Sequence, residues 1–259
     1  MVAGKRKIGM PRQKTKKTLI KILLERRLVE TEAIGRSLIM AGKVLVNDQR
    51  CDKAGEVFDA KVNIRIKNEN GGYVSRGALK LKGAIAELGL DRDFLGATVV
   101  DAGSSTGGFT EVVLEKGAAK VHAIEIGSNQ LAWSLRSHPA VFLQENTDIR
   151  SLGKGFDNKV TWIVGDLSFI SLGLILPHLA NLSEHEDLRL LLLIKPQFEL
   201  SEKEVPEGGI VEDDKLRQKA VDQVTTTAAG CGLKLITTCE SAVSGRYGNR
   251  EIFALFQKA

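Results

Sequence analysis

Residues 99–127, VVDAGSSTGGFTEVVLEKGAAKVHAIEIG, predict the centre of the fold. An apolar, β-branched strand runs into Asp101, a glycine-rich turn follows over 103–108, and helical composition continues to about Lys116. A second predicted strand, 121–126, carries Glu125 near its carboxyl end. Glycines let a backbone approach a ligand closely, and strand ends in open α/β sheets form ligand crevices. We therefore predict a βαβ unit with a nucleotide-type binding turn.

The glycine pattern of this turn excludes two common phosphate sites. It lacks the G-x-G-x-x-G dinucleotide fingerprint and the G-K-[ST] of a P-loop. An acid at the strand end, followed by Gly103 and Gly107, favours a neutral or cationic adenosyl ligand, and Glu125 lies about twenty residues on, where it suits a ribose diol. We infer that the turn binds S-adenosylmethionine; the alternative is an ordinary βα turn.

Composition bounds the class of protein. The 259 residues suggest one large or two small domains, and the net charge is +5. Residues 1–17 hold seven lysines and arginines and no acid, so we expect a flexible tail that touches polyanions. The sequence has no secretory signal pattern and no apolar run of membrane-spanning length, and its three cysteines are scattered. We expect a cytoplasmic protein without stable membrane association.

Residues 18–67 predict a small α+β domain. Apolar stripes indicate two helices, the second capped by Thr31, with Ile34, Leu38 and Ile39 facing inward, and strand patterns follow. Basic residues mark the helices and the helix–strand turn, and we expect them to contact a phosphate backbone unless they are simply solvated helix charges: Arg26, Arg27, Arg36 and Lys43.

The string GRSLIMAGKVLVNDQRCDKAGEVFD resembles the RNA-binding module named after ribosomal protein S-four. Its A-G-x-V-x-V-N pattern stands at Ala41, Gly42, Val44, Val46 and Asn47. The resemblance implies that this domain binds RNA. Residues 68–74 are polar and glycine-rich and predict a linker to a second domain over 75–259.

The second domain continues the alternation of strands and helices. Ser75 is the predicted cap of a helix to about Leu88, and the charged loop 202–214 is a candidate flexible lid. Further strands are predicted over 140–143, 160–164, 188–194, 234–238 and 251–256, the last antiparallel, and further helices over 130–137, 172–182 and 215–229.

Three charged residues fall where predicted strands meet the crevice: Asp166, Lys195 and Glu251. Lys195 directly follows the apolar run 190–194, whose residues are expected to be buried. We therefore expect the Lys195 amine to lie in the crevice; the alternative is a side chain that extends to solvent. Methyl transfer to a hydroxyl requires alignment of oxygen, methyl carbon and sulfur, and help with the hydroxyl proton. Lysine–carboxylate pairs suit that chemistry, and no metal is required.

Several separated motifs resemble the hemolysin-A-type (TlyA-like) ribosomal RNA 2′-O-methyltransferases and, more distantly, the FtsJ-type enzymes: VSRGALKL, DAGSSTGGFTEVVLEKGA, GSNQLAWSLR, DLSFISL, KPQFE and GNREIFALF. The resemblance implies a Lys-Asp-Lys-Glu tetrad, which motif matching assigns to Lys80, Asp166, Lys195 and Glu251. It also implies a Rossmann-like fold with a seven-stranded, mostly parallel sheet whose last strand is antiparallel. The implied partners are ribosomal RNA or ribosomal subunits.

From the motifs and the resemblance together we expect these cofactor-binding residues: Asp101, Gly103, Ser104, Ser105, Gly107, Glu125, Ile126, Thr147, Asp148, Asp166 and Phe169. Thr147 and Asp148 could instead belong to a solvated loop. Arg76 joins the expected RNA-binding residues. Two rival functions are an RNA-binding assembly factor with an inactive methyltransferase fold and a membrane-lytic hemolysin. The absence of a long amphipathic lytic helix argues against the second.

Overall fold

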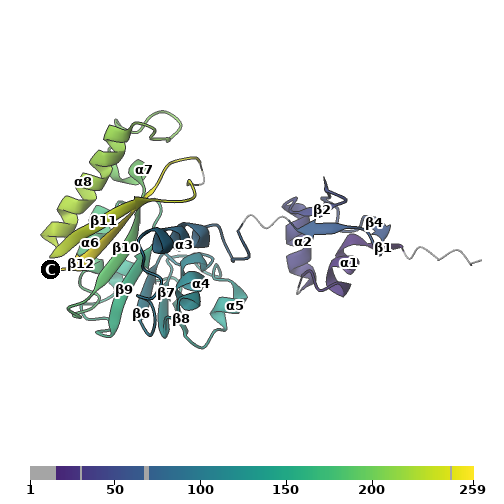
Figure 1. Cartoon of the computed structure of the whole chain (residues 1–259), viewed down its shortest axis with the longest axis horizontal. Helices are drawn as coiled ribbons and strands as arrows, with labels where there is room; N and C mark the ends of the chain where they lie inside the picture. Colours follow the sequence, from purple (N-terminus) through teal and green to yellow (C-terminus); the bar gives the residue numbers. More distant parts are fainter. Residues whose placement is uncertain (1–15, 30, 67–69, 246) are drawn as a thin grey trace, which may run out of the picture. The chain divides into compact units, whose positions relative to one another are not determined.

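A computed structural model describes residues 16–29, 31–66, 70–245 and 247–259. The chain divides into two compact units, residues 1–69 and 70–259 (Figure 1). The predicted basic tail, up to residue 15, lies outside the described residues, as do positions 68 and 69 of the predicted linker.

The smaller unit packs two helices against short strands. Its elements are β1 (Lys16–Thr18), α1 (Leu19–Glu25), α2 (Glu32–Met40), β2 (Val44–Val46), β3 (Gln49–Arg50), β4 (Val57–Asp59) and β5 (Ile64–Ile66). β1 pairs with β4, and β2 lies between β3 and β5. Leu19, Leu23, Ile39 and Val44 are fully buried between these elements.

The second helix of this unit begins as the sequence predicts, but one inward residue was wrong. The Thr31 hydroxyl accepts a hydrogen bond from Ile34 N at 3.3 Å and caps α2. Ile34, however, is 44% exposed. The buried face of α2 is formed by Gly35 and Ile39, which lie four residues apart and therefore on the same side of the helix. The helix packs so closely at this face that a Cβ on Gly35 would collide with Ile20.

The described part of the larger unit contains a seven-stranded sheet in the order β11-β12-β10-β9-β6-β7-β8. Strand β12 runs antiparallel to both neighbours, and the other pairings are parallel, which confirms the predicted fold class. The strands are β6 (Thr98–Ala102), β7 (Lys120–Ile124), β8 (Val141–Gln144), β9 (Val160–Gly165), β10 (Arg189–Ile194), β11 (Leu233–Glu240) and β12 (Ile252–Lys258).

Helices cover both faces of this sheet (Figure 1). α3 (Gly77–Glu87) and α4 (Gly108–Glu115) pack on one face; α6 (Leu172–Leu179) and α8 (Asp214–Gly230) pack on the other. β10 shows the consequence: Leu190 and Leu192 join one core cluster, whereas Leu191 and Leu193 join the other. An interior parallel strand buried on both faces reads as a continuous apolar run.

The strand order places a crevice at the carboxyl end of β6. β6 lies between β9 and β7, so the connections leaving β6 and β9 diverge there, and such a switch point is where open α/β sheets bind ligands. The chain turns at this point: the N–H groups of Gly103 and Ser104 both donate to Ile124 O. Because β12 is antiparallel, its first residues reach the same edge.

Three local predictions need correction. The helix expected over 130–137 is only α5 (Trp133–Arg136), because Asn129 has a φ of 55° and Leu131 turns into the core. Ser75 does not cap α3; Arg76 holds the N-cap position without a side-chain hydrogen bond. The expected lid is anchored near its end, where Val211 is 1% exposed within the core.

Gly108 sets how closely α4 approaches α3. A Cβ there would lie 2.3 Å from Ser75 Oγ and 2.8 Å from the backbone nitrogen of Ala78. We expect Gly108→Ala to lower the free energy of unfolding by about 1–3 kcal/mol, since backbone cannot yield as a side-chain end can.

Gly77→Ala is the matched control, because the nearest heavy atom to its Cβ would be 3.4 Å away. We expect it to leave stability unchanged or to raise it by at most about 1 kcal/mol, the helix-propensity difference between glycine and alanine. Urea titrations followed by circular dichroism measure both variants. Equal stability of the two would contradict the close helix approach.

Candidate active site

Four charged side chains from distant segments meet at the carboxyl edge of the sheet. Lys80 comes from α3, Asp166 follows β9, Lys195 follows β10 and Glu251 precedes β12. Lys80 Nζ lies 2.6 Å from Glu251 Oε2 and 3.6 Å from Asp166 Oδ2. Lys195 Nζ lies 2.6 Å from Asp166 Oδ1. The structure thus brings together the four residues that the resemblance implied. Their side chains contact one another in a row of alternating charge, the charged chain.

The charged chain is largely removed from water. Lys80 is 9% exposed, Lys195 6% and Glu251 3%. Two ammonium groups and two carboxylates balance one another, as buried charges must. Lys195 also donates to Ser168 Oγ at 2.6 Å, a contact that sequence reasoning missed. The ammonium of Lys195 is therefore held from two sides.

A cavity of about 700 Å³ opens beside the charged chain. Eight of the predicted cofactor residues line it: Gly103, Ser105, Glu125, Ile126, Thr147, Asp148, Asp166 and Phe169. Asp101, Ser104 and Gly107 are not among the lining residues. Sequence reasoning missed other lining side chains, among them Gln130, Arg150, Leu167 and Ser168. The position of Ser168 and Leu167 between two predicted residues, Asp166 and Phe169, was the available signal.

Glu125 organises the glycine-rich turn. Its carboxylate accepts hydrogen bonds from Ser105 N at 2.9 Å and Gly127 N at 2.7 Å, and it is 7% exposed. Gly107, with a φ of 98°, has no room for a side chain, because a Cβ would lie 2.3 Å from Leu135. Glu125 and Gly107 therefore fix the path of the turn at the edge of the cavity.

Asp101 lies behind the turn and is 1% exposed. Thr110 Oγ1 donates to its Oδ2 at 2.6 Å, while its Oδ1 has no hydrogen-bond partner among the described residues. Burial raises the pKa of Asp101 to about 7, the bonds from Thr110 oppose this rise, and the nearby Asp166 and Glu125 add to it. The free protein therefore holds this carboxyl near the midpoint of its titration at neutral pH.

Asp148 also lines the cavity and is ionised. The Arg150 guanidinium and backbone N–H donate to its carboxylate, which lowers the pKa of Asp148 to about 2. Phe169 stands at the rim, 88% exposed with a φ of 64°, and its ring centroid is 5.3 Å from that of Phe198. A bulky residue rarely adopts a positive φ, and such strain is typical of functional sites.

The lining fits an adenosyl cofactor of positive charge. Carboxylates of Glu125, Asp148 and Asp166 face the cavity, and Ile126 and Ile149 give it apolar walls. Carboxylates accept hydrogen bonds from ribose hydroxyls and stabilise a sulfonium, whereas they repel a pyrophosphate. The donor set therefore favours S-adenosylmethionine over a dinucleotide.

The residues predicted to bind RNA differ in their surroundings. Arg26 donates to Ala60 O and Val62 O, so its guanidinium fastens the smaller unit itself. Arg36 pairs with Glu32 along α2. Among the described residues, Arg27 and Lys43 have no ion pair or side-chain hydrogen bond, and Arg76 is exposed at the start of α3. Arg27 and Lys43 remain the freest predicted phosphate contacts of the smaller unit.

Comparison with known proteins gives consistent matches. The sequence profile of the FtsJ-like methyltransferases matches residues 73–258. The chain is 39% identical over 233 residues to the 16S/23S rRNA (cytidine-2′-O)-methyltransferase TlyA of Mycobacterium tuberculosis, covering 89% of this chain and 86% of that protein. It is 36% identical over 231 residues to Hemolysin A of Brachyspira hyodysenteriae, covering 88% and 94%.

A solved structure of a hemolysin-type protein from Streptococcus thermophilus is 34% identical, with a TM-score of 0.71, and the match covers 95% of this chain and 90% of that one. The profile spans all but the ends of the larger unit, and thus includes the cavity and all four residues of the charged chain. From these matches, the chain belongs to the FtsJ-like methyltransferase family and uses S-adenosylmethionine as its cofactor.

Proposed function

We propose that this protein methylates a ribose 2′-oxygen of ribosomal RNA. The observation that carries the proposal is the position of Asp166, which lines the cofactor cavity and contacts both buried lysines. A methyl group bound in the cavity would therefore lie beside charged groups able to handle a hydroxyl proton. The names of the relatives from M. tuberculosis and other bacteria support ribosomal RNA as the substrate.

Each member of the charged chain has a proposed role. S-adenosylmethionine, when bound, supplies a methyl group already activated by the sulfonium. Lys195 steers the ribose hydroxyl and assists loss of its proton, and Asp166 and Ser168 hold the lysine in place. Lys80, fixed by Glu251, holds the ribose or its phosphate. Most of the rate enhancement then comes from alignment and a preorganised charge distribution.

The cofactor site is assigned on the same basis. Glu125 would bind the ribose diol, and Asp101, Gly103, Ser104, Ser105 and Gly107 would shape the turn around the cofactor. Ile126, Thr147, Asp148 and Phe169 would surround the adenine. Glu125 already accepts two backbone hydrogen bonds, so it presents its remaining lone pairs in a fixed direction.

The smaller unit is the proposed RNA-binding module of S-four type. Arg27 and Lys43 are its proposed phosphate contacts, while Arg26 acts chiefly in folding. The rRNA methyltransferase names of several relatives favour an enzyme over a membrane-lytic protein. Within the described residues no helix has the length and apolar character needed to cross a bilayer. The complete charged chain also favours an enzyme over an inactive assembly factor.

Lysine variants test the proposed chemistry. We expect Lys195→Ala to lower kcat by about 10²–10⁴-fold, the usual worth of a positioned acid–base group. Lys80→Ala should also lose most activity, because it leaves Glu251 buried without its partner.

Lys82→Ala is the matched control on the same helix. Lys82 is half-exposed and contacts Tyr73 and Glu115 at the surface, so we expect near-normal activity. Methylation of ribosomal RNA with a labelled cofactor measures all three, and calorimetry verifies that the cofactor still binds. Full activity of Lys195→Ala would refute the proposed role.

Asp101 gives a prediction about pH and stability. Its pKa rises from an ordinary 3.8 to about 7 on folding, so its contribution to stability is complete below pH 3.8 and is lost as pH rises to 7. An amide does not titrate. We therefore expect the stability of Asp101→Asn relative to wild type to be greater at pH 8 than at pH 5.

Urea denaturation at the two pH values measures this difference. Asp187 is exposed, so Asp187→Asn is the control, and its stability relative to wild type should be the same at pH 5 and pH 8. A stability of Asp101→Asn relative to wild type that is equal or lower at pH 8 than at pH 5 would contradict the raised pKa of the buried carboxyl.

Salt dependence tests the RNA-binding assignment. A side chain that contacts a phosphate contributes about 1 to the slope of log affinity against log salt concentration. We expect Arg27→Gln and Lys43→Gln each to reduce that slope by about this amount. Arg26→Gln should instead lower stability, since two backbone carbonyls lose their donor.

The exposed Lys159→Gln in the larger unit is the charge-matched control. Filter binding to ribosomal RNA over a range of salt concentrations gives each slope. Slopes that stay at the wild-type value in Arg27→Gln and Lys43→Gln would remove these residues from the interface.

A further inference from the structure

We propose that Asn249 is a positioning residue for catalysis, acting through Glu251 on Lys80. The inference rests on the proposed function, because it assumes that the Lys80–Glu251 pair takes part in methyl transfer. Asn249 lies two residues before Glu251 and outside the cofactor cavity. Its role follows from what its side chain fastens.

The Asn249 side chain joins two loops that are distant in sequence. It is 3% exposed, its Oδ1 accepts from Val211 N at 2.8 Å, and its Nδ2 donates to Gly209 O at 2.8 Å. Val211 is itself buried in the core beside α8. The loop before Glu251 is therefore fixed to a rigid part of the fold by one buried and one part-buried hydrogen bond.

The same loop forms a wall against the catalytic carboxylate. The backbone O of Asn249 accepts from Gly245 N at 2.8 Å, which folds the loop back on itself. An ideal Cβ on Gly245 would lie only 2.5 Å from Glu251 Oε1. Glu251 is thus confined between the backbone of Gly245 on one side and Lys80 on the other. Moving this loop would move the carboxylate.

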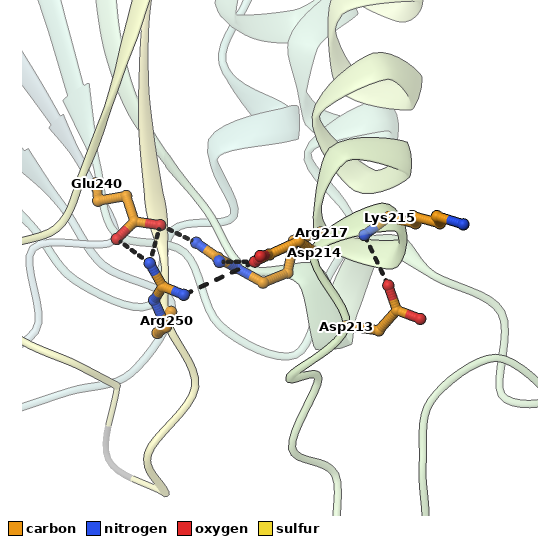
Figure 2. A network of polar contacts seen from close by, with 6 residues as sticks. All are labelled: Asp213, Asp214, Lys215, Arg217, Glu240 and Arg250. Atoms are coloured by element: carbon orange, nitrogen blue, oxygen red, sulfur yellow. Dashed lines mark hydrogen bonds and ion pairs between the residues drawn. The ribbon is translucent and has the colours of Figure 1, made fainter.

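An ionic cluster fastens the outer side of the same junction (Figure 2). Arg250 donates to both oxygens of Glu240 at 2.7 and 2.6 Å, and Arg217 contacts Glu240 and, at 2.6 Å, Asp214. Asp213 caps α8 through Lys215 N. The cluster ties the start of α8 to the end of β11 and to the residue next to Glu251.

The two attachments differ in strength. The side chain of Arg250 is 57% exposed, and exposed ion pairs contribute little and weaken with salt. Glu240 also keeps Arg217 if Arg250 is lost. Removing the Asn249 amide instead leaves the buried N–H of Val211 without a partner and frees the part-buried C=O of Gly209, which favours a shift of the loop. The structure therefore assigns the positioning of Glu251 to Asn249 rather than to Arg250.

A double-mutant cycle tests this role: wild type, Asn249→Ala, Glu251→Gln and the double variant. Small displacements of catalytic groups cost up to about 100-fold in rate, so we expect Asn249→Ala to lower kcat by about 10- to 100-fold. Affinity for S-adenosylmethionine and KM for RNA should stay within about twofold. If Asn249 acts through Glu251, adding Asn249→Ala to the Glu251→Gln variant should lower kcat by less than about a further threefold.

Three further variants separate positioning from general destabilisation. Gly245→Ala removes no hydrogen bond but crowds Glu251, and should reproduce both the loss of kcat and the non-additivity; it also serves if Asn249→Ala fails to fold. Val224→Ala weakens the core under α8 and should keep full kcat below its unfolding temperature. Arg250→Ala should keep kcat within about threefold.

The outcomes distinguish the two proposals. Normal kcat in both Asn249→Ala and Gly245→Ala, or losses that multiply fully with Glu251→Gln, would overturn the positioning role while leaving the tetrad intact. Full activity in Glu251→Gln itself would overturn the proposed catalytic function of the Lys80–Glu251 pair, and the positioning role with it.

Discussion

The organising constraint of this protein is the meeting of four alternating charges at one edge of a sheet: the buried Glu251, Lys80 and Lys195 and the partly buried Asp166. A buried charge that loses its partner destabilises a fold strongly, so all four must arrive together. The topology meets this condition. β9 and β10 are parallel and deliver Asp166 and Lys195 from their carboxyl ends, while the antiparallel β12 delivers Glu251 from its start. Lys80 arrives from α3, which packs against α4 through Gly108.

The glycine-rich turn adds a second energetic cost to the same region, that of burying carboxyl groups. Asp101 is buried with one oxygen unpartnered, and Glu125 is committed to backbone donors of the turn. A fold selected only for stability would place an apolar residue at Asp101. The carboxylates that line the cavity, those of Glu125, Asp148 and Asp166, suit the cationic cofactor proposed to bind there. Asp166 belongs to both regions, which links binding of the methyl donor to the geometry of the lysines.

The sequence predicted the elements that follow from local chemistry. The βαβ unit and Lys195 after its apolar strand follow from period and composition. The antiparallel last strand was expected from its place as the closing hairpin partner and from the resemblance. Lys80 could not be separated from Lys82 by spacing, because packing of α3 decides which of the two faces inward; only the resemblance nominated Lys80. Arg26 was predicted to contact RNA, but its acceptors are carbonyls more than thirty residues away in sequence. Asn249 escaped prediction for the same reason.

Two polar side chains outside the charged chain, the partly buried Glu199 and the buried Asn249, explain how its geometry is held. Glu199, after Lys195, accepts from Ser171 Oγ at 2.6 Å and Leu172 N at 2.9 Å, so it joins the segment carrying Lys195 to the segment carrying Asp166. Asn249 does the same for the segment carrying Glu251. Uncharged or singly charged groups that bind backbone can fix a loop without disturbing the charge balance beside it. Preorganisation of this kind keeps the charged centre in place while the rim at Phe169 stays exposed to solvent.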